Sequence, residues 1–263
     1  MKVSLIISTY NWVEALRLCL LSVLEQNVLP DQVIIADDGS DDKTKQLIDQ
    51  INQESTIDLN HVWHEDKGFR LSQIRNKAIL EVENEYIIQI DGDVILHPYF
   101  IKDHIRLSKK NTFIKAYRSN LTEEKTLNLF NTKKLNLHWY CKGVKNKENS
   151  IRFFTYNLLF NKTKQDVVGI MGSNMAYWKE DVLAINGFNI DFVGWGAEDK
   201  EFAQRLVNLG CFKRRIKFSA IQYHLYHKEA DKNNHDRQMK LLEKIKVSKS
   251  IKCNNGLKKI DFD

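Results

Sequence analysis

The chain has 263 residues and a formal net charge of +6 at pH 7, with 43% hydrophobic and 28% charged residues. This composition is typical of a globular protein with its own core, and it excludes a disordered or low-complexity chain. No apolar run approaches the length needed to cross a bilayer, and the first residues start on a strand pattern rather than a signal peptide. Four scattered cysteines without metal-binding spacing favour free thiols in a reducing, cytoplasmic setting.

The positive charge is unevenly distributed. Lysines gather in residues 133–147 and again in residues 244–259. Such stretches permit contact with anionic lipid, and thus a peripheral place at the inner membrane face, or with an anionic substrate. A solvated surface explains most of these lysines equally well. No nucleic-acid-binding motif accompanies them, so we expect no nucleic-acid partner.

In chain order, residues 3–8 form an apolar run that predicts a buried strand. Asn11 followed by Glu14 resembles a capping box, and leucines at helical spacing then predict a helix through residue 26. A second strand, residues 32–36, ends in Asp37-Asp38-Gly39-Ser40, and Ser40 or Asp41 can cap the helix that follows to about residue 50.

The next elements continue the alternation of strand and helix. Residues 61–63 predict a weaker strand, residues 71–83 a helix carrying Arg75, and residues 86–90 a buried strand that ends in Asp91-Gly92-Asp93. This order favours an α/β fold with a mostly parallel sheet, right-handed crossovers and helices on both faces.

The sequence Asp91-Gly92-Asp93 stands where ligands bind in open α/β sheets, at the carboxyl end of a strand. Two carboxylates separated by a glycine suit a hard divalent cation that also touches phosphate oxygens. An Asp-Gly hairpin turn is the alternative. The first strand lacks the glycine-rich turn of dinucleotide-binding proteins, which argues against a nicotinamide or flavin enzyme.

The second half is less regular. We expect a helix from about Pro98 and a strand over residues 112–117, followed by a polar, lysine-rich insert over residues 118–165. Order returns with an apolar segment, 167–177, and with a helix that ends at Leu209, before Gly210. A strand over 212–218, the segment Tyr223-His224-Leu225-Tyr226-His227 and a charged helix to at least residue 246 complete the chain.

Five stretches together resemble one family, the inverting nucleotide-sugar glycosyltransferases of the GT-A fold called family two. They are Ser8-Thr9-Tyr10-Asn11, Asp37-Asp38-Gly39-Ser40, Arg75-Asn76, Asp91-Gly92-Asp93 and Gly194-Trp195-Gly196-Ala197-Glu198-Asp199. The second half is similar to the C-terminal module of β-1,4-galactosyltransferases and bacterial chondroitin-type polymerases. The resemblance covers residues 3 to about 230, without the insert.

The resemblance implies a donor site. Thr9 and Tyr10 would line the base pocket, Asp38 would accept the uracil imide N–H, and Arg75 would pair with the diphosphate. Each has a plainer reading: Tyr10 as an ordinary strand end, Asp38 as a helix cap, and Arg75 as a surface residue.

The resemblance also implies a metal site. Asp91 would hold the ribose or a metal-bound water, Asp93 would ligate the cation, and His224 or His227 would add an imidazole, with His227 preferred. Carboxylate and imidazole together favour Mn²⁺, with Mg²⁺ as the alternative. Both histidines could instead be ordinary strand or loop residues.

On the acceptor side, Asp199 matches the catalytic base, which takes the proton of the attacking hydroxyl, and a helix N-terminus would keep it ionised. Glu198 would bind acceptor hydroxyls and Trp195 would offer a flat face to a sugar. Small residues at Gly172 and Asn174 would let the acceptor approach the donor. The plainer reading is that the acidic pair only caps the following helix.

These expectations amount to one GT-A domain over residues 1–263. Its parts are a nucleotide-sugar half (1–117), the insert (118–165), an acceptor half (166–230) and a basic tail (231–263). We expect a metal-dependent, inverting transfer of a hexose or N-acetylhexosamine from a UDP-sugar to a glycan or lipid-linked glycan hydroxyl, as in bacterial surface polysaccharide synthesis. A nucleotidyltransferase and a non-catalytic UDP-sugar or glycan-binding module are the alternatives.

Overall fold

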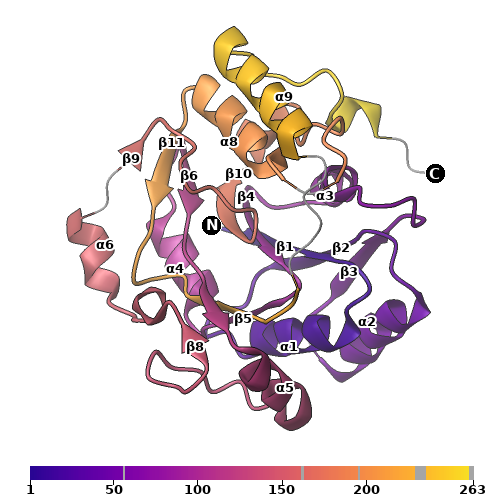
Figure 1. Ribbon diagram of the computed structural model, residues 1–263, viewed down its shortest axis with the longest axis vertical. Coiled ribbons are helices and arrows are strands. Elements are labelled where there is room, and N and C mark those ends of the chain that lie inside the picture. The colour runs from indigo at the N-terminus through magenta and orange to yellow at the C-terminus, as the bar shows by residue number, and fades with distance from the viewer. Residues whose placement is uncertain (56, 161–162, 195, 229–234, 261–263) are drawn as a thin grey trace.

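The computed structural model describes residues 1–55, 57–160, 163–194, 196–228 and 235–260 (Figure 1). The strands are β1 (Val3–Thr9), β2 (Gln32–Asp37), β3 (Leu59–Trp63), β4 (Tyr86–Asp91), β5 (Val94–Leu96), β6 (Thr112–Lys115), β7 (Ser119–Leu121), β8 (Val144–Lys145), β9 (Thr163–Lys164), β10 (Asn174–Trp178), β11 (Phe212–Arg215) and β12 (Gln222–His224). The α-helices are α1 (Val13–Leu24), α2 (Asp42–Glu54), α3 (Leu71–Leu80), α4 (Phe100–Leu107), α5 (Glu123–Thr132), α6 (Phe154–Phe160), α7 (Lys179–Ala184), α8 (Glu198–Asn208) and α9 (His235–Ser248).

The large sheet has eight strands in the order β3-β2-β1-β4-β10-β6-β11-β9. The first four are parallel, as the strand–helix alternation predicts. β10 runs antiparallel to β4 and β6, whereas β6 and β11 are parallel to each other. The sequence did not reveal this reversal, because direction depends on where the chain re-enters the sheet. The carboxyl ends of β1, β4 and β6 therefore share one edge with the start of β10.

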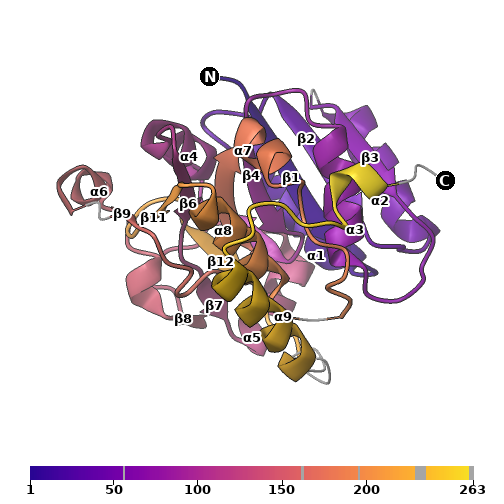
Figure 2. The same cartoon turned by 90° about the horizontal axis from the view of Figure 1, so that it is seen from above.

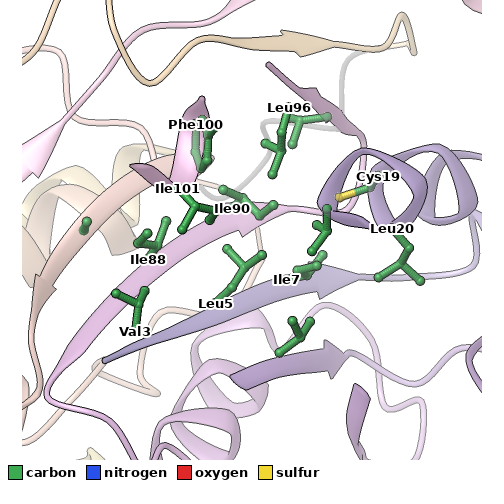
Figure 3. Close-up of a cluster of buried hydrophobic side chains, with 14 of the residues drawn as sticks. Val3, Leu5, Ile7, Cys19, Leu20, Ile88, Ile90, Leu96, Phe100 and Ile101 are labelled. Atoms are coloured by element: carbon green, nitrogen blue, oxygen red, sulfur yellow. The ribbon is translucent and has the colours of Figure 1, made fainter. Parts of the chain in front are cut away.

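Both faces of the large sheet are covered, which explains why β1 is buried at every position. On one face, Leu5 and Ile7 pack in one core with Leu20 of α1 and Phe100 of α4 (Figure 3). The same core includes Leu47 of α2. Burying each such side chain contributes about 1.5–3 kcal/mol.

The opposite face of the sheet has a second core. Ile6 and Tyr177 lie there with Ile74 of α3, Val182 of α7 and Phe202 of α8. Helix α9 lies beside α8 in both views (Figures 1 and 2). This face carries α3 and α8, and with them the residues Arg75 and Asp199.

A second sheet, in the order β5-β12-β7-β8, joins distant parts of the chain. β12 pairs antiparallel with β5, so that His224 lies opposite Val94. The segment 118–165 supplies β7, α5 and β8, and its Leu121 and Leu129 pack in a third core with Leu18 of α1. The lysine-rich segment is thus attached to the domain through its own apolar contacts.

Two local expectations were wrong. The capping box at Asn11 does not form: Trp12 is the N-cap of α1, without a side-chain cap bond, and Asn11 instead accepts a hydrogen bond from the Asp41 amide. The strand expected over 212–218 ends at Arg215. By contrast, Asp41 caps α2 as one of the two predicted residues. Among the described helices, none is long and apolar enough to cross a membrane.

Candidate active site

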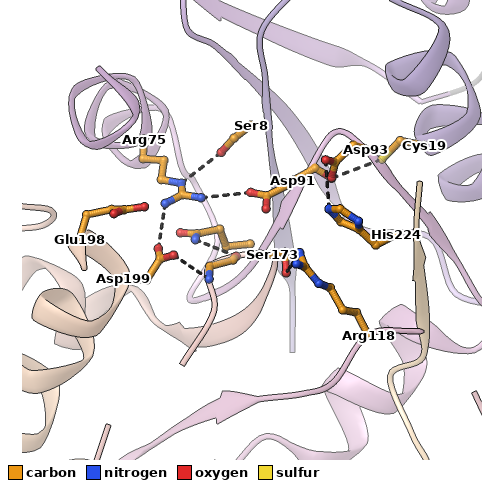
Figure 4. A network of polar contacts seen from close by, with 12 residues as sticks. Ser8, Cys19, Arg75, Asp91, Asp93, Arg118, Ser173, Glu198, Asp199 and His224 are labelled. Atoms are coloured by element: carbon orange, nitrogen blue, oxygen red, sulfur yellow. Dashed lines mark hydrogen bonds and ion pairs between the residues drawn. The ribbon is translucent and has the colours of Figure 1, made fainter. Parts of the chain in front are cut away.

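Arg75 lies at the centre of a polar cluster at the carboxyl edge of the sheet (Figure 4). It comes from α3 and is only 1% exposed. Its guanidinium donates to Asp199 Oδ1 at 2.8 Å, to Asp91 Oδ1 at 3.1 Å and to Ser8 Oγ at 3.2 Å. Burial opposes its charge, but Asp199 and Asp91 outweigh burial and raise the pKa of Arg75. The guanidinium of Arg75 therefore joins the strand that ends in Asp91 to the helix that begins at Glu198.

Asp199 is held from two sides. Its Oδ1 accepts from Arg75, and its Oδ2 accepts from the Gly172 amide at 2.7 Å. A Cβ on Gly172 would lie 2.3 Å from Asp199 Oδ1, so no other residue fits there without moving the carboxylate. Gln89 fixes this loop by donating to the Gly172 carbonyl at 3.0 Å. The small residue expected near the acceptor thus serves first to let Asp199 approach the backbone.

Glu198 lies beside Asp199 at the start of α8 and is buried. Its Oε2 accepts from the Gly196 amide at 3.1 Å, where Gly196 has a φ of 110° that a residue with a side chain rarely adopts. Burial, with the nearby Asp199 carboxylate, raises the pKa of Glu198 to about 7. A carboxyl group that is partly protonated near neutrality can both donate and accept hydrogen bonds.

Asp91 and Asp93 differ although only a glycine separates them. Burial raises the pKa of Asp91 to about 6, although Arg75 opposes the shift. Burial acts in the same direction on Asp93, but hydrogen bonds from His224 and His227 outweigh it and hold its pKa below the usual value. Asp91 faces Arg75, and Asp93 faces the histidines (Figure 4).

The three predicted metal ligands meet in space. His224 Nε2 lies 3.2 Å and His227 Nε2 lies 3.3 Å from Asp93 Oδ2, and all three ligand atoms lie within 4.8 Å of one another. The pairing of β12 with β5 brings them together, and the Leu225 amide donates to the Asp93 carbonyl. Hydrogen bonding to Asp93 raises the pKa of His227, as expected where a proton occupies the place of a cation.

These residues fit a divalent transition metal. Asp93 Oδ1 is buried and has no hydrogen-bond partner in the described chain, which leaves a carboxylate oxygen free to coordinate. His227 Nδ1 lies 2.7 Å from the Lys228 carbonyl, and such an outer contact directs Nε2 toward a metal. One carboxylate and two imidazoles favour Mn²⁺ over Mg²⁺.

The expected base pocket is only partly open. Asp38 is buried, and its oxygens accept from His64 Nε2 at 2.7 Å and from the Arg70 amide at 2.9 Å. Thr9 lies at the end of β1, 9% exposed. Tyr10 is half exposed, and its hydroxyl donates to Asp66 Oδ2 at 2.9 Å. If Asp38 binds uracil as predicted, it must do so with the lone pairs that these two hydrogen bonds leave.

Three expectations for single residues need comment. Asn174 is buried, its Oδ1 lies 3.0 Å from His104 Nε2, and its amide nitrogen donates to the Ala220 carbonyl at 3.1 Å. Its polar groups thus serve the fold, and the role predicted for this small residue on the acceptor side stays a prediction. Arg75 contacts the carboxylates of Asp91 and Asp199, and its pairing with a diphosphate stays a prediction. Trp195 lies outside the described residues.

Sequence reasoning gave no role to Ser8 or Arg118. Ser8 was quoted only as part of a motif, yet its hydroxyl accepts from Arg75. Arg118 lies in the insert, and its guanidinium donates to Ser173 Oγ at 3.4 Å, next to Gly172 (Figure 4). The position of Ser8 at the carboxyl end of the first strand could have indicated a place in the site. Nothing in the sequence around Arg118 indicates such a place.

Comparison with protein families gives two matches. The model of glycosyl transferase family 2 matches residues 4–183, which is more than half of the chain. A model described as the N-terminal domain of galactosyltransferase matches residues 154–228. Together the two matched ranges include Arg75 with its partners Asp91 and Asp199, and also the three predicted metal ligands.

Curated relatives include polysaccharide synthases. The chain is 25% identical over 253 residues to chondroitin synthase of Escherichia coli, with 84% of this chain and 34% of that protein covered. It is 24% identical over 245 residues to hyaluronan synthase of Pasteurella multocida, covering 81% and 23%. The chain thus spans about a third or less of the length of these relatives.

Solved structures share the fold. S. aureus TarS 1-349 in complex with UDP-GlcNAc has a TM-score of 0.64 at 16% identity, covering 95% of this chain and 69% of that one. The mannosyltransferase PcManGT from Pyrobaculum calidifontis, in complex with GDP-Man and Mn²⁺, has a TM-score of 0.58 at 16% identity, covering 95% and 62%. These similarities support the predicted GT-A fold.

Proposed function

The chain belongs to glycosyl transferase family 2, and from that premise we propose that it transfers a hexose or N-acetylhexosamine from a UDP-sugar to a glycan hydroxyl, with inversion. The observation that carries this proposal is the pairing of Arg75 with both Asp91 and Asp199. It sets a donor-side carboxylate and a candidate base on one buried guanidinium, which would place the donor and the acceptor side by side for a single displacement.

Asp199 is the proposed base. The acceptor hydroxyl would lie against its carboxylate and give up its proton as the oxygen attacks the anomeric carbon. Asp199 accepts one hydrogen bond from Arg75 at Oδ1 and one from the Gly172 amide at Oδ2, and its oxygens keep further lone pairs that could take the proton. These two contacts also fix its direction before the acceptor arrives, which spares a reorientation during the reaction.

Glu198 is proposed to bind the acceptor. With a pKa of about 7, part of its population carries a proton near neutral pH and can donate to a sugar hydroxyl. Its place beside Asp199 on α8 allows both side chains to contact the same acceptor residue. This division gives the two adjacent carboxyl groups different tasks.

A divalent cation is proposed at Asp93, His224 and His227, since their ligand atoms converge and one oxygen of Asp93 has no partner. Such a cation would supply positive charge to the diphosphate of the leaving nucleotide. Asp91, adjacent to both clusters, would contact the ribose or a water molecule on the cation. Arg75 would hold this donor-side carboxylate in place, close to where the diphosphate is expected.

A donor panel tests the proposal. We would measure nucleotide release from UDP-glucose, UDP-galactose, UDP-N-acetylglucosamine, UDP-N-acetylgalactosamine and GDP-mannose. Each donor would be used with Mn²⁺, with Mg²⁺ and with EDTA. Metal-dependent UDP release from one UDP-sugar is expected. Release only from GDP-mannose would contradict the choice of nucleotide. Tight UDP binding without turnover on any donor and acceptor would favour the non-catalytic binding module, and diphosphate release from a nucleoside triphosphate would favour the nucleotidyltransferase.

A further inference from the structure

Lys115, at the end of β6, is a buried lysine without an anionic partner. It is 3% exposed, and its Nζ lies 3.4 Å from the centroid of the Tyr117 ring. No ion pair or hydrogen bond joins this ammonium to a residue in the described ranges. Burial, together with nearby Arg215, Lys213 and Arg118, lowers its pKa to about 8. A buried ammonium surrounded by other cations is costly, and its charge calls for an anion.

Two of the neighbouring cations also lack a carboxylate. Arg215 of β11 lies opposite Lys115 in the parallel register, and its guanidinium donates to the Tyr117 hydroxyl. Arg118 donates to Ser173 Oγ. In the part of the chain that the structure describes, neither arginine forms an ion pair with a carboxylate. Three positive charges thus gather without compensation from the fold.

Lys213 shows that the fold can neutralise a lysine in this region. It lies on β11 two residues before Arg215 and is 1% exposed. Its ammonium pairs with Asp166 and donates to the Val168 carbonyl at 2.9 Å. Lys213 therefore has the partners expected of a structural lysine, whereas Lys115 has no carboxylate or carbonyl partner among the described residues, only the Tyr117 ring.

The position of these charges relates them to the acceptor. Lys115 lies opposite Met175 of β10 and on the same face as the core under α8, the helix that carries Asp199. A Cβ on Gly169 would lie 4.0 Å from Lys115 Nζ, so the ammonium borders the loop that continues to Gly172 and Ser173. β6 lies two strands from β4, roughly 10 Å at the usual strand spacing, on the side away from β1 and β2.

We propose that Lys115, Arg118 and Arg215 form a subsite for an anionic group, a carboxylate or a phosphate, on the acceptor glycan. The proposal rests on the proposed function only in that it takes Asp199 to mark the acceptor side. Arg118, through Ser173, lies nearest to Asp199, and Lys115 and Arg215 extend the subsite away from the donor. The anion would then sit on the accepting sugar or on its neighbour.

Matched glycosides test the subsite without requiring sugar transfer. The probes are 4-nitrophenyl β-glucuronide, 4-nitrophenyl β-glucoside and its 6-phosphate, titrated by ligand-observed NMR. At least one charged glycoside should bind about 10–100-fold more tightly than the neutral glucoside, as charge-assisted hydrogen bonds imply. The tighter of the two anions identifies a uronic acid or a phosphate as the source. Equal affinity for all three glycosides would overturn the proposal.

Variants assign the preference to these residues. Lys115→Met and Arg215→Gln should each reduce the ratio of charged to neutral affinity about tenfold, whereas Lys142→Met, which removes one exposed lysine of the insert, should leave the ratio unchanged. A ratio that survives both substitutions would overturn the assignment. Because binding is measured directly, a protein that transfers no sugar can still show the subsite, and an active enzyme can still lack it.

Thermal unfolding supplies a second readout with Lys213→Met as its matched control. Lys213→Met breaks an ion pair and should lower Tm. Lys115→Met removes an unpaired buried charge and should keep Tm at or above that of the wild type. A loss of Tm as large as that of Lys213→Met would show that the fold itself satisfies Lys115, and would overturn the proposal.

Discussion

Two carboxylates at the same edge of the sheet, Asp93 and Asp199, are neutralised in different ways. Asp93 faces two imidazoles, His224 and His227, whereas Asp199 faces the guanidinium of Arg75 and a backbone amide. An imidazole can lose its proton and then coordinate a metal ion, but a guanidinium keeps its charge at any pH that a protein tolerates. The first cluster can therefore exchange its protons for a metal cation, whereas in the second the positive charge of Arg75 stays in place beside Asp199.

The two clusters also differ in how the chain builds them. The Asp93 cluster comes from the turn after β4 and from β12, joined by backbone pairing. The Asp199 cluster comes from α3, the loop before β10 and α8, joined only by side chains and one amide. The comparison separates the cluster that we propose to bind a cation from the cluster that we propose to position a base. Four experiments can test this distinction.

The largest effect is expected for Asp93→Ala. It removes the carboxylate shared by both histidines and should lower metal-dependent transfer by about 10³-fold or more. Mn²⁺ should raise Tm of the wild-type protein in the presence of UDP but leave the variant unchanged. Differential scanning fluorimetry and nucleotide release are the measurements. A variant that works normally in excess EDTA would remove the metal role.

Asp199→Asn should come next. The amide keeps the size of the carboxylate but cannot take a proton, so transfer should fall by about 10²–10⁴-fold. Binding of UDP and Mn²⁺, measured by calorimetry, should change little. Glu198→Gln is the matched control, and it should raise the acceptor KM more than it lowers kcat. An inactive Glu198→Gln variant together with an active Asp199→Asn variant would identify Glu198, and not Asp199, as the base.

Gly172→Ala should have a smaller effect that is confined to the Asp199 cluster. The new Cβ would lie 2.3 Å from Asp199 Oδ1 and force the carboxylate out of position. A misplacement of about 1 Å in a catalytic group can cost about 10²-fold in rate. Val168→Ala, which shortens an exposed side chain of the same loop and keeps its backbone, should remain near wild-type activity. Equal losses in both variants would mean that the loop, not the carboxylate, limits the reaction.

The smallest effect concerns pH and the histidines. The raised pKa of His227 means that its contact with Asp93 stabilises the metal-free protein below pH ~6.5, and that this contribution is lost as pH rises through the folded pKa. Metal binding has the opposite dependence, because only neutral imidazole coordinates. In EDTA, His227→Ala should therefore lose more stability at pH 6 than at pH 8. The same loss at both values would contradict the pairing.

Much of the donor half could be predicted from the sequence because its signals are local. β1, β2 and β4 are short apolar runs with polar ends, and parallel pairing brings those ends to one edge. The proximity of Asp93 to His224 and His227 was correctly expected, but from resemblance rather than spacing. The short strand β5 brings Asp93 close to the two histidines. It was missed because three residues after a turn are too few to show the alternating pattern of a strand.

The remainder depends on contacts between distant residues. That Arg75 would be buried between Asp91 and Asp199 could not be read from a helix in which it looks like a surface residue. The contacts of Asn174 with His104 and Ala220 were not foreseen, because neither partner lies near it in the sequence. Lys115 gave no signal, since one lysine at a strand end is ordinary unless its neighbours are known.

The antiparallel pairing of β5 with β12 has a consequence for synthesis on the ribosome. Asp93 emerges early, but His224 and His227 follow only after another 130 or so residues, a count taken from their numbering. Because N-terminal segments fold first as a chain is made, the strands of the donor half can assemble well before the histidines exist. A nascent chain stopped before β12 should thus contain a folded nucleotide-binding half without a metal site, so that activity would arise only late in translation.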